Sequence, residues 1–407
     1  MEISLNLAHT LGVSVLVLLF GKLLVNKISF LSKYCIPAPV VGGLVFSLIA
    51  LFGHVSGSFS FTMDGSLKSL FMTCFFTTVG FGVSFETLKK GGVAVFLFLI
   101  LTSAYATLQN IVGVSFAKFF GLNPLLGLAM GSVPLTGGHG TSAAFAPLLE
   151  QAGATGAQTV AIAAATFGLI GGCMIGGPVA KRLIEKYNLK PTKVSVNQEA
   201  LATETGSLAT SEVAIACEEK IELDTGNLTM AFYQVALAVG IGTVVSSFIK
   251  DLGITVPTYI GAMLIAVILR NVSISNFEIR SVEINALGEI FLSIFLAQAL
   301  MSLKLWELVE LAIPMMVILL VQITLMGTFA YFITFRVMGK DYDAAVLSSG
   351  HCGFGMGATP NAIANMNAVV ARYFPSPKSF FVLPMVGGMF IDFTNATIIT
   401  TFINIFK

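Results

Sequence analysis

The chain has 407 residues, of which 56% are hydrophobic and only 11% are charged, and its mean hydropathy is +0.89. Because soluble domains carry about 25% charged residues, this composition excludes an ordinary soluble enzyme and indicates a protein that crosses the lipid bilayer many times. The formal net charge of +1 gives no reason to expect nucleic-acid binding.

Ten apolar runs are long enough to cross the roughly 30 Å hydrocarbon layer of a bilayer. Two further stretches, 122–150 and 342–370, are apolar but richer in Gly, Ser, Thr and Pro, and we interpret them as re-entrant hairpins. The segment 185–227 is polar and acidic, which is typical of a linker, so it separates an N-terminal unit, 1–184, from a C-terminal unit, 228–407. The ten predicted transmembrane helices cover 6–24, 38–55, 67–85, 92–119, 158–180, 228–249, 255–270, 284–303, 309–335 and 379–403.

The two units resemble each other at an offset of 218 residues. This offset pairs Pro39 with Pro257, and it pairs "GGHGTSAA" (137–144) with "GMGATPNA" (355–362). Each unit then has five spans and one hairpin. Because five is an odd number, the second unit is expected to enter the membrane upside down, which is the inverted-repeat architecture of secondary transporters.

The distribution of basic residues predicts the orientation. With the N-terminus outside, 17 of the 22 Lys and Arg residues fall on the inner side, as the positive-inside rule requires. We therefore expect an all-α polytopic membrane protein with both termini outside and the central linker in the cytoplasm.

The two glycine-rich tips are the strongest functional candidates. Non-helical backbone at membrane depth must be buried in protein or line a watery cavity, and glycine lets the backbone approach a ligand closely. Exposed N–H groups at a helix start favour carboxylates, and nearby oxygens suit a hard cation, so we predict a carboxylate substrate coupled to a cation. The candidate substrate-binding residues are Thr136, Gly137, Gly138, His139, Gly140 and Thr141 in the first tip, and Gly355, Gly357, Ala358, Thr359 and Asn361 in the second.

Polar side chains in or beside the spans are candidates for binding the cation. Asp392 lies in the apolar segment "MFIDFTNATI", where a lone carboxylate is costly unless a cation or hydrogen bonds compensate it. The candidate Na⁺ ligands are Ser142, Asn365, Asp392 and Asn395. His139 and His351 have three open roles: to bind substrate, to carry a proton, or to brace a tip. The segment "GGCMIGG" (171–177) is expected to pack helices closely.

Five segments resemble the sodium/glutamate symporter family of bacteria: "IPAPVVGGL", "GGHGT", "LKLWEL", "GHCGFGMGATPNAIANM" and "MFIDFTNA". The resemblance implies uptake of L-glutamate across the bacterial inner membrane, with Na⁺ as the coupling ion, by a homodimer. It also implies an elevator-type mechanism, in which a mobile domain carrying both hairpins slides against a scaffold. The residues carried over by motif are Gly137, Gly138, Gly140 and Thr141 in the first tip, and Gly355, Gly357, Thr359 and Asn361 in the second.

Other functions remain open from the residues alone. A symporter for another carboxylate, such as aspartate or citrate, would need the same tips, and the histidines leave H⁺ coupling possible. A channel or an intramembrane enzyme is the alternative of another class. A channel would be expected to line one continuous path, and an enzyme would need a nucleophile paired with a base, which the sequence does not indicate.

Overall fold

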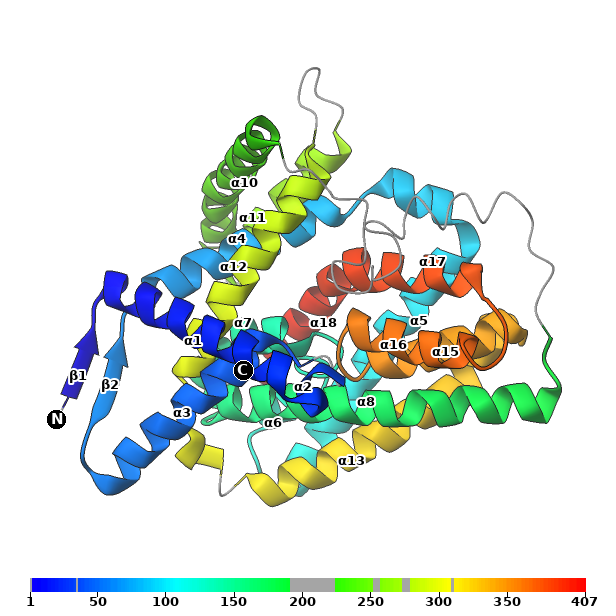
Figure 1. Cartoon of the computed structure of the whole chain (residues 1–407), viewed down its shortest axis with the longest axis horizontal. Coiled ribbons are helices and arrows are strands. Elements are labelled where there is room, and N and C mark those ends of the chain that lie inside the picture. Colours follow the sequence, from blue (N-terminus) through cyan, green and yellow to red (C-terminus); the bar gives the residue numbers. More distant parts are fainter. Residues whose placement is uncertain (1, 34–35, 191–223, 252–256, 273–278, 309–310) are drawn as a thin grey trace.

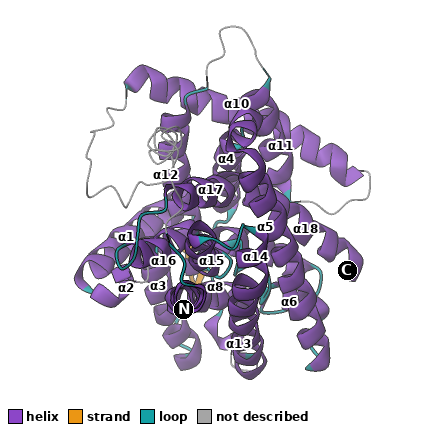
Figure 2. Cartoon of the chain, turned by 90° about the vertical axis from the view of Figure 1, so that its right-hand side faces the viewer, coloured by secondary structure: helices purple, strands orange, loops and turns teal. Residues whose placement is uncertain are grey.

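The computed structural model describes residues 2–33, 36–190, 224–251, 257–272, 279–308 and 311–407, and these residues are almost entirely helical (Figures 1 and 2). Most of the predicted linker, 191–223, lies outside the described residues. The helices of the first half are α1 (Leu7–Lys27), α2 (Ser29–Lys33), α3 (Ala38–Ser56), α4 (Ser66–Gly82), α5 (Phe85–Phe119), α6 (Pro124–Leu128), α7 (Gly138–Gln151) and α8 (Ala157–Tyr187).

The second half also contains long helices and a pair of short ones. Its elements are α10 (Thr225–Asp251), α11 (Thr258–Asn271), α12 (Ser281–Met301), η1 (Leu305–Leu308), α13 (Ala312–Phe329), η2 (Ala330–Thr334), α14 (Phe335–Val337), α15 (Tyr342–Phe354), α16 (Thr359–Val370), α17 (Pro377–Met385), η3 (Val386–Phe390) and α18 (Ile391–Phe406). Of these, η2 and η3 are π-helical segments that join neighbouring helices.

One short sheet departs from the predicted all-helical fold. Strand β1 (Glu2–Leu5) pairs in parallel with β2 (Ser60–Met63), and Glu2 lies opposite Ser60. Each strand has four residues that alternate between exposed and half-buried. Segments this short lie at the ends of apolar runs, so the hydropathy of the adjoining spans conceals them in the sequence.

The number of helices long enough to span a membrane is smaller than the ten we predicted. Among the described residues, seven helices are long and apolar enough, or eight if α17 and α18, which meet at a 44° bend, count as one span. The predicted spans over 67–85 and 255–270 form α4 and α11, which have 17 and 14 residues. At 1.5 Å per residue they are roughly 25 Å and 21 Å long, short of the roughly 30 Å hydrocarbon layer.

The stretches 122–150 and 342–370 both form a pair of short helices joined by a turn. Each begins in the same way: a glycine with positive φ, Gly121 (70°) or Gly339 (125°), precedes a capping side chain two residues later. Asn123 accepts a hydrogen bond from the first turn of α6, and Asp341 accepts one from the first turn of α15. These caps satisfy N–H groups that a helix start leaves unpaired. Each stretch is therefore a helix–turn–helix unit, and its re-entry into the membrane stays a prediction.

The helices pack into two groups (Figure 1). The first group, toward the left of Figure 1, contains α1, α3, α4, α10, α11 and α12; the second contains α5 to α8 and α13 to α18. Glycines bring helices of the first group together: a Cβ on Gly42 would lie 2.0 Å from the Val17 carbonyl oxygen, and one on Gly261 would lie 2.1 Å from that of Gly242. The groups meet where α12 packs on α7 and α4 packs on η3.

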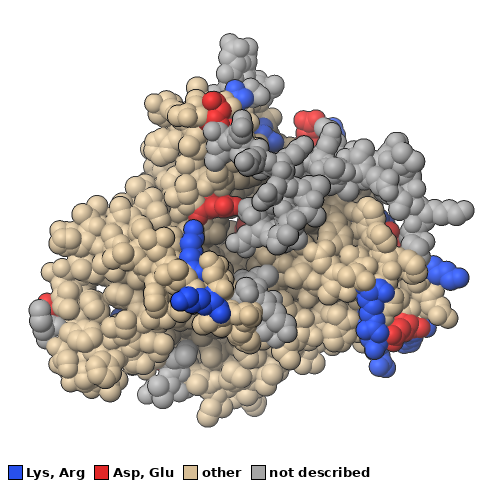
Figure 3. Space-filling view, in the orientation of Figure 1, with Lys and Arg blue, Asp and Glu red and all other residues tan. Residues whose placement is uncertain are grey.

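Charged side chains are few on the face in Figure 3 and lie in small groups among uncharged residues. Large apolar side chains are exposed along the outer helices, such as Leu16, Phe52 and Val244 at 66%, 69% and 70%. Contact with lipid would cover such side chains. Both hairpins, by contrast, are buried within the second group: Leu125–Thr136 and Tyr342–Gly357 are buried without interruption.

Candidate functional site

The first hairpin turn, residues 129–137, is held by side chains from two other helices. Ser132 donates its backbone N–H to Asn110 Oδ1 of α5 at 2.8 Å, and its carbonyl oxygen accepts from Asn395 Nδ2 of α18 at 3.2 Å. The turn closes on itself through Gly137 N–H, which donates to the Ser132 carbonyl oxygen at 2.9 Å. Backbone polar groups that leave a helix inside a membrane protein must be satisfied in this way.

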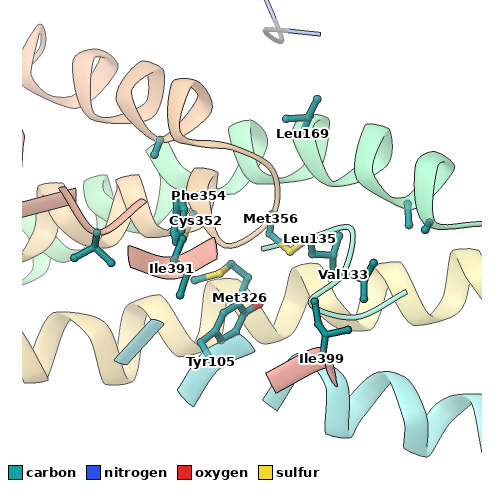
Figure 4. Packing of buried hydrophobic residues seen from close by; sticks show 14 of the residues in the cluster. Tyr105, Val133, Leu135, Leu169, Met326, Cys352, Phe354, Met356, Ile391 and Ile399 are labelled. Atoms are coloured by element: carbon teal, nitrogen blue, oxygen red, sulfur yellow. The ribbon is translucent and has the colours of Figure 1, made fainter. Parts of the chain in front are cut away.

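The second turn, Gly355–Ala358, follows α15. Gly355 and Gly357 donate their N–H groups to the carbonyl oxygens of His351 (2.7 Å) and Phe354 (3.3 Å). The carbonyl oxygen of Gly355 accepts from Gln109 Nε2 of α5 at 2.8 Å. In Figure 4, Met356 of this turn and Leu135 of the first turn point toward one another between α8 and α13.

One glutamine joins the two turns. Gln109 donates to Gly355 through Nε2, and its Oε1 accepts from the Thr136 hydroxyl at 2.6 Å. A second glutamine, Gln322 of α13, donates to the backbone carbonyl oxygens of Gln109 (2.9 Å) and Met130 (3.3 Å). The turns also approach each other directly, because a Cβ on Gly138 would lie 3.1 Å from the Gly357 carbonyl oxygen. The two tips that the predicted repeat pairs at an offset of 218 residues therefore lie next to each other in space.

Two helix starts lie at this meeting point, and neither has a side-chain cap. Helix α7 begins at Gly138 after Gly137, and α16 begins at Thr359 after Ala358; among the described residues, no side-chain hydrogen bond caps either start. The first N–H groups of a helix have no partner within it, and the helix dipole makes this end attractive to anions. Gly138 has φ 65°, a left-handed conformation that favours glycine.

Each of the two predicted histidines contacts a threonine hydroxyl of a neighbouring element. His139 is buried, and its Nε2 lies 3.0 Å from the Thr166 hydroxyl of α8. His351 is also buried: its Nδ1 lies 2.9 Å from the Thr334 hydroxyl, and its ring contacts the ring of Tyr105 edge-on at 5.5 Å. Of the three roles left open by the sequence, these contacts favour bracing.

The asparagines of α16 fasten that helix to α8. Asn361 Nδ2 donates to the Leu169 carbonyl oxygen at 3.0 Å, and Asn365 Nδ2 donates to that of Gly172 at 3.0 Å. The glycine face of α8 makes this approach possible: a Cβ on Gly168 would lie 2.1 Å from the Met356 carbonyl oxygen, and one on Gly172 would lie 2.8 Å from that of Cys352. The close packing expected for "GGCMIGG" is therefore present, with Gly172 and its neighbours against the second hairpin.

The four candidate Na⁺ ligands lie in different surroundings. Ser142 donates to the Gly138 carbonyl oxygen at 2.8 Å, Asn365 is bonded to α8, and Asn395 is bonded to the first turn. Asp392 is half-buried on α18 and interacts electrostatically with Tyr259 of α11, across the boundary of the two groups. No hydrogen bond between described residues joins any two of these four side chains.

Three buried side-chain oxygens around the first turn have no hydrogen-bond partner among the described residues. They are Ser132 Oγ, Gln322 Oε1 and Asn395 Oδ1. All three side chains hold or belong to the same turn, and Ser132, Gln322 and Asn395 are at most 1% exposed. Leaving a buried polar atom unpaired costs about 1–3 kcal/mol, so these oxygens are suited to a ligand, and oxygens are what a hard cation prefers.

Sequence reasoning missed Gln109, Asn110, Ser132 and Gln322. For Gln109, Asn110 and Gln322 the signal was present, because uncharged polar side chains interrupt the apolar runs "YATLQNIVG" and "LLVQITL". Polar residues inside membrane spans face protein or a cavity rather than lipid. An uncharged polar residue in a span does not by itself reveal which contact it makes, and no motif marks these four.

The first tip faces the first helix group. A Cβ on Gly140 would lie 3.5 Å from Phe75 of α4 and 3.6 Å from Leu292 of α12. Nearby, Tyr259 of α11 contacts Phe145 of α7 edge-on, with 5.9 Å between ring centroids. The meeting point of the turns is therefore next to the boundary between the groups.

Three comparisons place the chain among known proteins. The family model described as Sodium/glutamate symporter matches residues 3–375. The sodium/glutamate symporters of Escherichia coli (strain K12) and Haemophilus influenzae (strain ATCC 51907 / DSM 11121 / KW20 / Rd) are 43% and 42% identical over 406 residues, which cover 98% of this chain and 98% and 97% of theirs. A solved sodium proton antiporter, MjNhaP1 from Methanocaldococcus jannaschii, aligns with a TM-score of 0.44 at 14% identity over 98% of each chain, a likeness too distant to bear on function.

Proposed function

The chain belongs to the sodium/glutamate symporter family, and on that premise we propose that it carries L-glutamate across the membrane together with Na⁺ and binds the substrate between its two hairpin turns. The family is one of transporters, which removes the enzyme alternative. Na⁺ is the coupling ion and is carried as a second substrate.

The observation that carries this proposal is the meeting of two uncapped helix starts, at Gly138 and Thr359. Glutamate has two carboxylates, and each helix start offers N–H groups and a positive dipole end to one of them. The backbone at Gly137 and Gly357 can approach the substrate closely because it carries no side chain there. Thr141 lies one turn into α7 and supplies a hydroxyl for the substrate.

For Na⁺, we propose a site at the first turn. Asn395 was predicted as a ligand, and Ser132 Oγ and Gln322 Oε1 are unpaired oxygens around the same turn. Ser142 and Asp392 stay candidates for a second Na⁺ near α7 and the group boundary, and Asn365 stays one at α8. Replacing Asn395 with Leu removes one oxygen ligand, and losing a buried polar contact costs about 1–3 kcal/mol. The Na⁺ concentration for half-maximal uptake is therefore expected to rise about tenfold, since a factor of ten corresponds to roughly 1.4 kcal/mol.

We further propose that the two halves are inverted repeats. A shift of 218 residues carries α1 onto α10, α3 onto α11, α4 onto α12 and α5 onto α13. The same shift carries Asn123, which caps α6, onto Asp341, which caps α15. Each helix group contains corresponding helices from both halves, which supports a common origin of the halves.

The two groups suggest how transport occurs. The second group contains both hairpins, and the substrate would be carried with it as it slides against the first group. The first group, α1, α3, α4 and α10 to α12, would be the scaffold and would form the homodimer contact. This elevator-type motion would open the site to either side of a bacterial inner membrane, with both termini outside and the central linker in the cytoplasm.

Uptake into proteoliposomes tests the function. Purified protein is expected to accumulate labelled L-glutamate when Na⁺ is higher outside, and to lose that accumulation when choline replaces Na⁺ at the same pH. Equal uptake in choline would refute Na⁺ coupling. Excess unlabelled aspartate or citrate is expected to compete less than unlabelled glutamate; stronger competition by either would assign the site to another carboxylate.

A further inference from the structure

A separate cavity lies at one end of the first helix group. It occupies about 380 Å³ between the start of α4, the ends of α3 and α12, and η1. This volume is within the roughly 300–1,000 Å³ typical of small-molecule sites. None of its lining residues belongs to either hairpin, so it is distinct from the site proposed above.

A buried amide without a partner lines this cavity. Gln298 of α12 is only 3% exposed, and neither its Nε2 nor its Oε1 has a hydrogen-bond partner among the described residues. Each unpaired buried polar atom costs about 1–3 kcal/mol, and native proteins rarely leave such groups unsatisfied. The amide therefore calls for a ligand that has both a hydrogen-bond donor and an acceptor.

The charged side chains around the cavity favour an anion that also carries an ammonium group. Lys68 and Lys304 line it and supply positive charge, and Asp64 supplies one carboxylate. Lys304 is also ion-paired with Glu307, with 3.6 Å between Nζ and Oε1, so Lys68 is the lysine on which the proposal mainly depends. His54 and Trp306 form a wall, with their rings stacked at 3.9 Å. A phosphate could pair with the lysines, but the Asp64 carboxylate would repel it and the Gln298 Oε1 would stay without a donor. An ammonium group can donate to both oxygens.

We propose that this cavity is a second binding site for an acidic α-amino acid. The choice of L-glutamate as its occupant rests on the proposed function. The cavity lies beside the transport machinery, because Gln158 Nε2 of α8 donates to the Ala299 carbonyl oxygen at 3.0 Å, one residue from Gln298. With Lys68 and Lys304 on the predicted outer side, the site would capture substrate before it reaches the hairpin turns.

The chain offers an intrinsic probe, because Trp306 is its single tryptophan. Full-length protein in phosphatidylcholine nanodiscs, in Na⁺-free choline buffer, would be titrated with L-glutamate while Trp306 fluorescence is recorded. We expect a saturable change that L-alanine does not produce. Gln298→Leu is expected to abolish it, and Lys68→Gln to raise the half-saturating concentration about tenfold. Lys181→Gln, an exposed lysine on α8, is the matched control and is expected to keep it.

Further arms separate this proposal from the hairpin site. Gly138→Ala is expected to keep the fluorescence change, and Gln298→Leu is expected to keep Na⁺-driven uptake at saturating glutamate, which also shows that it folds. The proposal is overturned if the change is absent or unsaturable, if inorganic phosphate produces it equally, or if Gly138→Ala removes it while Gln298→Leu does not. If the protein takes up glutamate but shows no fluorescence change, the second site is refuted and the proposed transport function is not. If it shows the fluorescence change but no Na⁺-driven uptake, the transport function is refuted and the second site is not.

Discussion

A single methyl group at Gly138 tests whether the contact between the hairpin turns shapes the substrate site. Gly138 has φ 65°, and an added Cβ would lie 3.1 Å from the Gly357 carbonyl oxygen. A left-handed conformation costs a residue with a Cβ roughly 1–2 kcal/mol, and the close oxygen requires one turn to shift by a few tenths of an ångström. Gly138→Ala therefore strains or displaces the start of α7.

We expect this displacement to weaken glutamate binding. If the strain of about 1–2 kcal/mol is relieved at the expense of the substrate contacts, the KM for L-glutamate rises about tenfold, because roughly 1.4 kcal/mol corresponds to a factor of ten. The assay is initial uptake of labelled glutamate into proteoliposomes across a range of concentrations, normalised to the amount of inserted protein.

Gly177→Ala is the matched control, because a Cβ at Gly177 of α8 meets nothing within 4 Å. It is expected to leave KM unchanged. Asn adopts the left-handed conformation more readily than Ala, so Gly138→Asn is the second variant if Gly138→Ala does not fold. Its Cβ would make the same close contact with the Gly357 carbonyl oxygen. A Gly138→Ala protein with the KM of Gly177→Ala would refute the reasoning.

Two further substitutions test the framework around the turns. Gln109→Leu removes the link between Thr136 and Gly355; unpaired buried groups cost about 1–3 kcal/mol each, so uptake is expected to fall at least tenfold at equal protein levels, and undiminished uptake would show that the link is dispensable. Gly168→Ala places a Cβ 2.1 Å from the Met356 carbonyl oxygen and is expected to lower the midpoint of thermal unfolding in detergent by several degrees, whereas an unchanged midpoint would contradict the close packing of α8 on the second hairpin.

The composition of 122–150 and 342–370 indicated two helix–turn–helix units, and the structure has a pair of short helices joined by a turn in each stretch. Glycine and hydroxyl residues recur at 137–141 and 355–359, and glycine permits the close backbone approach of the two turns. The helix lengths were less predictable. Hydropathy marks α4 and α11 as apolar, but it does not register the break at Val83 or the start of α11 after Pro257 that makes these helices short.

The partners of each polar side chain were beyond reach of the sequence. Asn361 and Asn365 are one turn apart, so their common face was predictable; that this face meets the backbone of α8 depends on tertiary packing. The partners of Gln109 were likewise not predictable from the sequence. An uncharged polar residue in a span signals a buried contact, but only the fold brings it between Thr136 and Gly355.

The central claim is that both turns contact one substrate, and cysteine protection measures this most directly. In protein whose five native cysteines are replaced and whose uptake is retained, single cysteines would be placed at Gly140, at Ala358 and, as a control, at Lys181. Alkylation by a small maleimide would be timed with and without L-glutamate and Na⁺. The account predicts that glutamate with Na⁺ slows alkylation at both Gly140→Cys and Ala358→Cys and leaves Lys181→Cys unchanged; protection at neither tip, or at only one, would contradict it.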